Sequence, residues 1–205
     1  MITNTNKWNK IRYSIHSIYY DLILLFFRKE RERAIQILSP EDGDSILIVG
    51  AGTGLDLPYL KGYYNIIATD ITPAMLRKLQ QRAKKLKINV SCMEMDGQNL
   101  TFDDNTFDCV ILNLILAVIP DPKRCIAEAE RVLKPDGKII VFDKFLDDNQ
   151  KPSLFRKILN FFSSAIFSDL NRKFSDILSD TNLKIEIKES SKFGGVFKIF
   201  RLLKK

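Results

Sequence analysis

The stretch ILIVGAGTGLDLPYL, residues 46–60, decides the fold of this chain. Four apolar residues predict a buried strand, and they run directly into three glycines at alternate positions, Gly50, Gly52 and Gly54. Glycine adopts backbone dihedrals that a Cβ would block, and it lets a ligand approach the bare main chain. We therefore expect a strand followed by a turn that wraps around a ligand.

Strand-like and helix-like segments alternate on both sides of this turn. The predicted strands are residues 45–50, 65–70, 89–96, 107–115 and 137–143, and the predicted helices are one that begins after Gly54, residues 72–87 and residues 121–135. Thr72 and Asp121 are capping residues, and each is followed by a proline at the first helical position. This alternation predicts a Rossmann-like, doubly wound α/β fold whose mostly parallel sheet is covered on both faces.

Helical and hairpin patterns flank this alternation. Residues 8–38 carry apolar side chains at helical spacing, and residues 152–178 show a second amphipathic helical pattern. Residues 183–189 and 193–203 alternate apolar and polar side chains, like two strands of an antiparallel hairpin. We expect an N-terminal helical cap and a seven-stranded sheet that ends in this hairpin as a reversed edge pair.

The net charge of +7 is concentrated at the two ends of the chain. Residues 1–40 carry seven Lys/Arg and three Asp/Glu, residues 41–150 carry thirteen and seventeen, and residues 151–205 carry twelve and five. The basic ends also contain the aromatic residues Trp8, Tyr13, Phe26, Phe27, Phe155, Phe161, Phe162 and Phe167. This composition suits contact with an anionic membrane surface, although helices that only cover the sheet would look similar.

Several other classes of protein are disfavoured. The apolar run LILLFF, residues 22–27, is far shorter than the roughly 18 residues of a membrane-spanning helix, and the N-terminus does not resemble a signal peptide. Cys92, Cys109 and Cys125 match no metal-ligand spacing, and His16 has no ligating neighbours in sequence. We expect reduced, buried cysteines, no metal site, and a cytoplasmic protein that is peripheral on the membrane if its basic ends bind lipid.

Two acidic residues follow predicted strands. Asp70 stands at the end of strand 65–70, where a carboxylate can accept both hydroxyls of a ribose. Asp96 precedes Gly97 after the next strand and can accept the exocyclic amine of adenine, or it is a solvated turn residue. The dinucleotide fingerprint requires a third glycine at position 55, which is Leu55 here, so a nicotinamide cofactor fits less well.

Four segments in series resemble the class I S-adenosylmethionine-dependent methyltransferases: ILIVGAGTG, ATDITPAML, MDGQNLTFDDNTFDCVILN and EAERVLKPDGKIIVFD. The resemblance covers residues 41–148 and extends through the terminal hairpin. It implies S-adenosyl-L-methionine as cofactor and S-adenosyl-L-homocysteine as product. The residues implied to contact the cofactor are Gly50, Ala51, Gly52 and Gly54 at the methionine part, Asp70 at the ribose, Ile71 and Met75 at the adenine face, Asp96 and Gly97 at the adenine edge, and Asn113 and Leu114 near the methyl group.

One position departs from the family pattern. The family commonly has an acid two residues before the first glycine, which helps to orient the methionine amino group, and here that position is Ile48. Asp56 could take over part of that task. The segments YYDLILLFFRKERERA, GTGLDLP, AMLRKLQQRA, VIPDPKRC and FGGVFKIFRLLKK resemble the bacterial phosphatidylethanolamine N-methyltransferases, and the quinone C-methyltransferases are similar too.

We expect a single methyltransferase domain over residues 1–205. Its parts are a helical cap at 1–40, a cofactor-binding core at 41–148, a helical lid at 149–181 and a terminal hairpin at 182–205. The oligomeric state is left open.

Methyl transfer from a sulfonium depends mainly on the alignment of two partners, so no dedicated acid–base pair is required. The candidates on the acceptor side are Tyr19, Tyr20, Asn113, Asp143 and Lys144. The segment NLILAVIP lacks the Asp/Asn-Pro-Pro-aromatic motif of enzymes that methylate bases or amides, which disfavours nucleic acid.

The expected reaction is therefore methylation of an amine-headed lipid, such as phosphatidylethanolamine, or of a lipophilic small molecule at the membrane surface. One alternative is a soluble small-molecule or quinone methyltransferase. Another is a regulatory protein that binds the cofactor without turnover.

Overall fold

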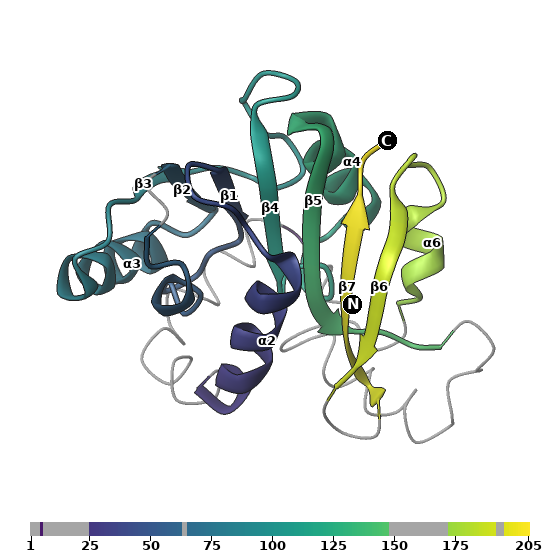
Figure 1. Cartoon of the computed structure of the whole chain (residues 1–205), viewed down its shortest axis with the longest axis horizontal. Helices are drawn as coiled ribbons and strands as arrows, with labels where there is room; N and C mark the ends of the chain where they lie inside the picture. The colour runs from purple at the N-terminus through teal and green to yellow at the C-terminus, as the bar shows by residue number, and fades with distance from the viewer. Residues whose placement is uncertain (1–4, 6–24, 63–64, 148–171, 192–194) are drawn as a thin grey trace.

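Seven strands form one sheet in the order β3-β2-β1-β4-β5-β7-β6 in the computed structural model, which describes residues 5, 25–62, 65–147, 172–191 and 195–205 (Figure 1). The strands are β1 Ser45–Val49, β2 Asn65–Asp70, β3 Ser91–Glu94, β4 Phe107–Asn113, β5 Leu133–Lys144, β6 Lys184–Ser190 and β7 Phe197–Leu203. The chain builds outward from β1 to β3 and then crosses back to β4. This order confirms the predicted doubly wound α/β fold.

The sheet is parallel except at one strand. Parallel ladders join β1 to β2 and β4, β2 to β3, and β4 to β5. β7 is antiparallel to both β5 and β6, so β6 runs in the same direction as β5. The expected antiparallel hairpin at the edge of the sheet is confirmed, and its inner strand, β7, is the strand that opposes its neighbours on both sides. Alternation of side chains predicts pairing within a hairpin and does not reveal which of its strands joins the sheet.

Helices cover both faces of the sheet (Figure 1). The short 3₁₀ turn η1 Leu25–Phe27 leads into α2 Arg28–Leu38, which shares one apolar core with α3 Pro73–Leu86. α4 Pro122–Val132 and α6 Phe174–Leu178 pack into the second core on the opposite face. In each core the apolar stripe of a helix meets alternate residues of the strands.

The two predicted helix starts use different hydrogen bonds. Asp121 caps α4 through its side chain, which accepts a 3.0 Å hydrogen bond from the N–H of Arg124. Thr72 precedes α3 in extended backbone but makes no capping bond with its side chain. Its backbone N–H instead donates to the carboxylate of Asp70 over 2.8 Å.

The helix predicted after Gly54 is absent from the described chain, and the 3₁₀ turn η2 Leu57–Tyr59 takes its place. Gly54 and Gly62 both have positive φ angles, of 79° and 100°. Residues in that conformation interrupt a right-handed helix, so the short segment between them holds a single helical turn.

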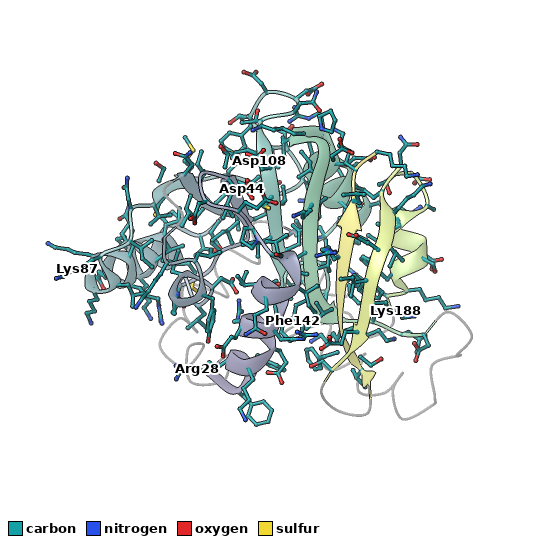
Figure 2. All side chains as sticks on the ribbon, in the orientation of Figure 1. Arg28, Asp44, Lys87, Asp108, Phe142 and Lys188 are labelled. Atoms are coloured by element: carbon teal, nitrogen blue, oxygen red, sulfur yellow. The ribbon has the colours of Figure 1, made fainter. Side chains whose placement is uncertain are left out.

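The amino ends and the carboxyl ends of the strands form two opposite edges of the sheet. Asp44 and Asp108 lie at the amino ends of β1 and β4, whereas Phe142 lies beside α2 toward the other edge (Figure 2). The turns that follow β1, β2, β3 and β4 gather at the carboxyl edge, where open α/β sheets bind ligands. None of the helices within the described ranges is long and apolar enough to cross a bilayer.

Candidate active site

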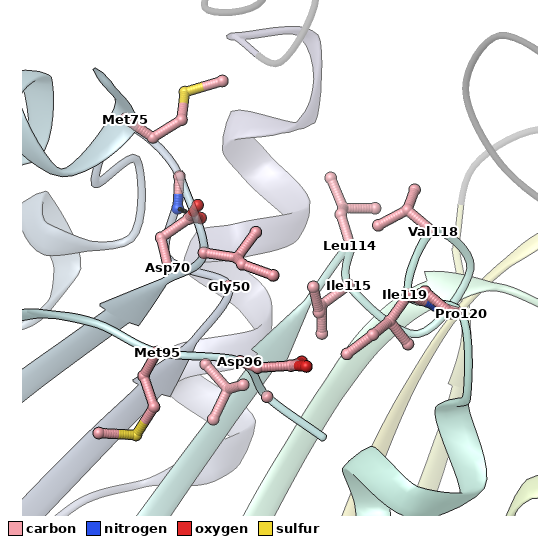
Figure 3. Close-up of a pocket in the computed structure, with 14 residues that line it drawn as sticks. Gly50, Asp70, Met75, Met95, Asp96, Leu114, Ile115, Val118, Ile119 and Pro120 are labelled. Atoms are coloured by element: carbon pink, nitrogen blue, oxygen red, sulfur yellow. Dashed lines mark hydrogen bonds between the residues drawn. The ribbon is translucent and has the colours of Figure 1, made fainter. Parts of the chain in front are cut away.

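A cleft at the carboxyl edge of the sheet encloses about 620 Å³, a volume that includes space open to solvent (Figure 3). It is lined by Val49, Gly50, Gly52, Asp70, Ile71, Met75, Met95, Asp96, Gly97, Leu114, Ile115, Val118, Ile119 and Pro120. Most of the residues expected to bind the cofactor are therefore brought together. Ala51, Gly54 and Asn113 were expected to join them, but they do not line the cleft.

The glycine turn forms one wall of the cleft, and its glycines serve different purposes. Gly50, Gly52 and Gly54 have φ angles of 66°, 55° and 79°. A Cβ on Gly50 would lie 2.5 Å from Cδ1 of Ile115, so this glycine allows the facing loop to approach. A Cβ on Gly54 would lie 2.8 Å from Cγ of Leu79 in α3, so this glycine permits packing against a helix.

Asp70 links the glycine turn to α3. Its Oδ2 accepts a 2.8 Å hydrogen bond from the N–H of Gly52, and its Oδ1 accepts one of 2.8 Å from Thr72. Burial raises the pKa of this carboxyl, although the two backbone bonds act in the opposite direction. A carboxylate offers about four lone-pair positions, so capacity remains for the hydroxyls of a ribose.

Asp96 is held in place and is not a freely solvated turn residue. Its Oδ1 accepts hydrogen bonds of 3.0 Å from both the backbone N–H and the Nε2 of Gln98. The Oε1 of Gln98 accepts a 2.8 Å bond from the N–H of Asp121 at the start of α4. Gln98 thus joins two walls of the cleft. Sequence reasoning missed this residue, although it lies in the quoted segment MDGQNL.

The apolar loop after β4 forms another wall of the cleft (Figure 3). Leu114 begins it with a φ of 61°, a left-handed conformation that turns the chain away from the strand. Arg172 holds the loop from outside the cleft, because its Nη1 donates to the carbonyl oxygens of Leu116 and Ile119. Sequence reasoning did not assign the residues beyond Leu114, although the apolar segment NLILAVIP directly follows a strand.

None of the candidates for the acceptor side is among the described residues that line the cleft. The side chain of Asn113 donates a 2.8 Å bond to Asp56, and Asp143 accepts bonds from the N–H groups of Ala117 and Lys144. Burial raises the pKa of Asp143. Neither Asn113 nor Asp143 lines the cleft, and Tyr19 and Tyr20 lie outside the described residues. Their catalytic roles remain predictions.

The cleft contains few groups for acid–base or nucleophilic chemistry. Among the described residues that line it, only Asp70 and Asp96 have titratable side chains. All three cysteines are free thiols; Cys109 and Cys125 are buried, whereas Cys92 is half-buried and so departs from expectation. Burial raises the pKa of Cys109 to about 12, so this thiol stays protonated at neutral pH. The cleft therefore suits a reaction that depends mainly on the alignment of the acceptor with the methyl group.

The sheet order, the glycine turn and the acid after β2 define an α/β protein that binds a nucleoside cofactor, of the class I methyltransferase type. Comparison with known proteins agrees. Residues 47–141 match the family model described as a methyltransferase domain. The chain is 26% identical over 161 residues to a phosphatidylethanolamine N-methyltransferase of Cereibacter sphaeroides, covering 78% of this chain and 79% of the relative.

A second relative is the ubiquinone/menaquinone biosynthesis C-methyltransferase of Pasteurella multocida, 31% identical over 180 residues, with coverage of 80% of this chain and 65% of the relative. The solved structure of geranyl diphosphate C-methyltransferase from Streptomyces coelicolor, which contains Mg²⁺, geranyl diphosphate and S-adenosyl-L-homocysteine, shares the fold. Its TM-score is 0.73 at 14% identity, over 86% of this chain and 79% of that one. The methyltransferase-domain match, these relatives and the shared fold support an S-adenosylmethionine-dependent methyltransferase, whose cofactor is S-adenosyl-L-methionine.

Proposed function

We propose that this methyltransferase acts on an amine-headed lipid or another lipophilic small molecule, with phosphatidylethanolamine as the first candidate. The observation that carries the proposal is the apolar wall that the loop after β4 gives to the cleft, while the carboxylates Asp70 and Asp96 come from the other elements that line it. An apolar wall beside the reacting centre favours an acceptor that has a hydrocarbon part. The similarity to the Cereibacter sphaeroides enzyme, which extends over most of both chains, supports the amine headgroup.

The bound cofactor supplies a methyl group on a positively charged sulfur. The tasks of the protein are to hold that group and to exclude water. We assign the ribose to Asp70, the adenine amine to Asp96 and the face of the adenine to Met75, all of which line the cleft. Alignment of a neutral amine with the methyl carbon removes roughly 7–11 kcal/mol of the barrier in favourable cases. The methylated ammonium product can lose its proton to bulk water after it leaves the cleft.

Association with a membrane surface is the second part of this proposal. Phe26 is 58% exposed, and the neighbouring Arg28 and Lys29 are exposed as well. Arg28 lies at the start of α2, toward the carboxyl edge of the sheet where the cleft opens (Figure 2). An exposed aromatic ring with adjacent cations suits an interface of anionic headgroups.

A methyl-transfer assay with a panel of acceptors tests this function. The purified protein is incubated with methyl-deuterated S-adenosylmethionine and, separately, with phosphatidylethanolamine vesicles, a demethylated quinone or water-soluble amines, and products are identified by mass spectrometry. We expect label in the phospholipid amine. Label only in the quinone would favour the quinone alternative, for which the Pasteurella multocida relative is the support. Cofactor binding without transfer to any acceptor would favour a regulatory role.

A further inference from the structure

A buried polar network connects α2 to the glycine turn and to β4. The Nη1 of Arg31 lies 2.8 Å from both carboxylate oxygens of Asp56, and the Nδ2 of Asn113 lies 2.8 Å from Asp56 Oδ1. The exposed fractions of Arg31, Asp56 and Asn113 are 5%, 2% and 5%. These residues come from α2, from the segment after the glycine turn and from the last position of β4, so the network fixes three parts of the chain together.

Two atoms of this network have no hydrogen-bond partner in the part of the chain that the structure describes: Nε of Arg31 and Oδ1 of Asn113. A carboxylate only accepts hydrogen bonds, so Asn113 must turn its Nδ2 toward Asp56 and its Oδ1 elsewhere. Nε of Arg31 is therefore a donor on a cationic group, and Oδ1 of Asn113 is an acceptor. Buried polar atoms nearly always have a partner, so this pair requires an explanation.

The network lies next to the cleft. β1 and β4 pair in parallel up to Ile48 opposite Ile111, and beyond this ladder a Cβ on Gly50 would lie 2.5 Å from Cδ1 of Ile115, two residues after Asn113. Leu114, the residue after Asn113, lines the cleft and has the left-handed conformation described above. The network therefore adjoins the wall formed by Gly50 and Leu114, which is the end of the cleft expected to hold the methionine part of the cofactor.

We propose that Arg31 and Asn113 bind the amino-acid end of S-adenosylmethionine. Nε of Arg31 donates to the carboxylate, and Oδ1 of Asn113 accepts from the ammonium group. Asp56 is a positioning residue: its charge is paired with Arg31, and it holds both side chains through hydrogen bonds. The network takes the task that relatives give to an acid at the position of Ile48. Both atoms are shielded from solvent, so binding requires a local side-chain movement.

Two ligands distinguish binding of the amino-acid end by Arg31 and Asn113 from a purely structural role of these residues. S-Adenosylhomocysteine has the amino-acid end, whereas 5′-methylthioadenosine has the same adenosyl thioether without it. We expect Arg31→Met to weaken binding of S-adenosylhomocysteine by about 10- to 100-fold in calorimetry, as for the loss of one charge-assisted hydrogen bond. Binding of methylthioadenosine should change less than about twofold. Asn113→Leu should have the same selective effect.

Arg33→Met is the matched control, because Arg33 lies on the same helix but forms an exposed ion pair with Glu189. It should leave both affinities unchanged. If Arg31→Met does not fold by circular dichroism, the pair Arg31→Met with Asp56→Leu removes both buried charges together. Equal loss for both ligands would overturn the proposal, as would no loss for either. The proposal is independent of the acceptor, and a wild-type protein that binds neither ligand would overturn the use of this cofactor itself.

Discussion

Asp70 Oδ2 accepts a 2.8 Å hydrogen bond from the backbone N–H of Gly52, which joins the tip of β2 to the glycine turn after β1. The other oxygen of the same carboxylate holds the start of α3 through Thr72. One side chain therefore fixes two of the backbone segments around the part of the cleft where we expect the ribose.

Replacing Asp70 tests this double role. We expect Asp70→Ala to weaken binding of S-adenosylhomocysteine by at least about tenfold, because the ribose hydroxyls lose a charged acceptor. Asp70→Asn retains the size and one carbonyl oxygen, so it should bind the ligand with intermediate affinity. Calorimetric titration measures both. Unchanged affinity in Asp70→Ala would remove the ribose assignment.

Gly43 lies outside the glycine turn and provides a matched control for a substitution at Gly50. Both have positive φ, but a Cβ on Gly50 would meet Ile115, whereas nothing lies within 4 Å of a Cβ on Gly43. We expect Gly50→Ala to lower the free energy of unfolding by about 1–3 kcal/mol more than Gly43→Ala, because of overpacking. Only Gly50→Ala should also weaken cofactor binding. Chemical denaturation and calorimetry check the two effects, and identical behaviour of the variants would contradict the close approach at Gly50.

Gln98 should determine how well the site distinguishes adenine from other purines. Gln98→Ala releases Asp96 from its side-chain bond, so we expect a higher KM for S-adenosylmethionine and a nearly unchanged kcat. The ratio of affinities for S-adenosylhomocysteine and its inosine analogue, which lacks the exocyclic amine, should fall in this variant. A constant ratio would indicate that Asp96 does not read the amine.

The raised pKa of Asp143 predicts that the free energy of unfolding depends on pH. Burial raises the pKa of its carboxyl in the folded chain. Its contribution to the free energy of unfolding is therefore fully present below the unfolded value of about 3.9, and it is lost as the pH rises through the folded value. Asp143→Asn should reduce this decline in urea titrations carried out at increasing pH above about 3.9. Parallel curves for the variant and the wild type would refute the shift, and a large loss of kcat would support the predicted catalytic role.

Membrane association should depend on the start of α2. We expect the pair Phe26→Ser with Arg28→Gln to lower co-sedimentation with phosphatidylglycerol vesicles at low salt, because it removes an exposed ring and an adjacent cation. Arg77→Gln removes an exposed cation from α3 and serves as the control. If both changes reduce binding equally, attraction by the overall positive charge is the better explanation.

The sequence predicted those parts of the site that depend on local order along the chain. Asp70 and Asp96 follow strands, and parallel strands bring their ends to one edge, so their presence in the cleft followed from periodicity and position. The order of the last two strands did not follow, because the sequence does not reveal which strand of the hairpin pairs with β5.

The parts that were missed depend on long-range contacts. The apolar loop takes its shape from Arg172, which is 53 residues from Ile119 in sequence. Asp56 was considered as a direct substitute for the acid missing at Ile48, but no local pattern revealed that Arg31 neutralises it. Gly54 belonged to the glycine pattern, yet only the packing of Leu79 shows why a side chain is excluded there.

The bridge made by Gln98 has a consequence for cofactor engineering. Since this one amide spans from Asp96 to the first turn of α4, its length sets the separation of the two walls between which we expect the nucleobase. Gln98→Asn or Gln98→Ser would open a gap at that point without altering the glycine turn. Such variants are the natural starting point for an enzyme that accepts synthetic sulfonium donors with enlarged bases.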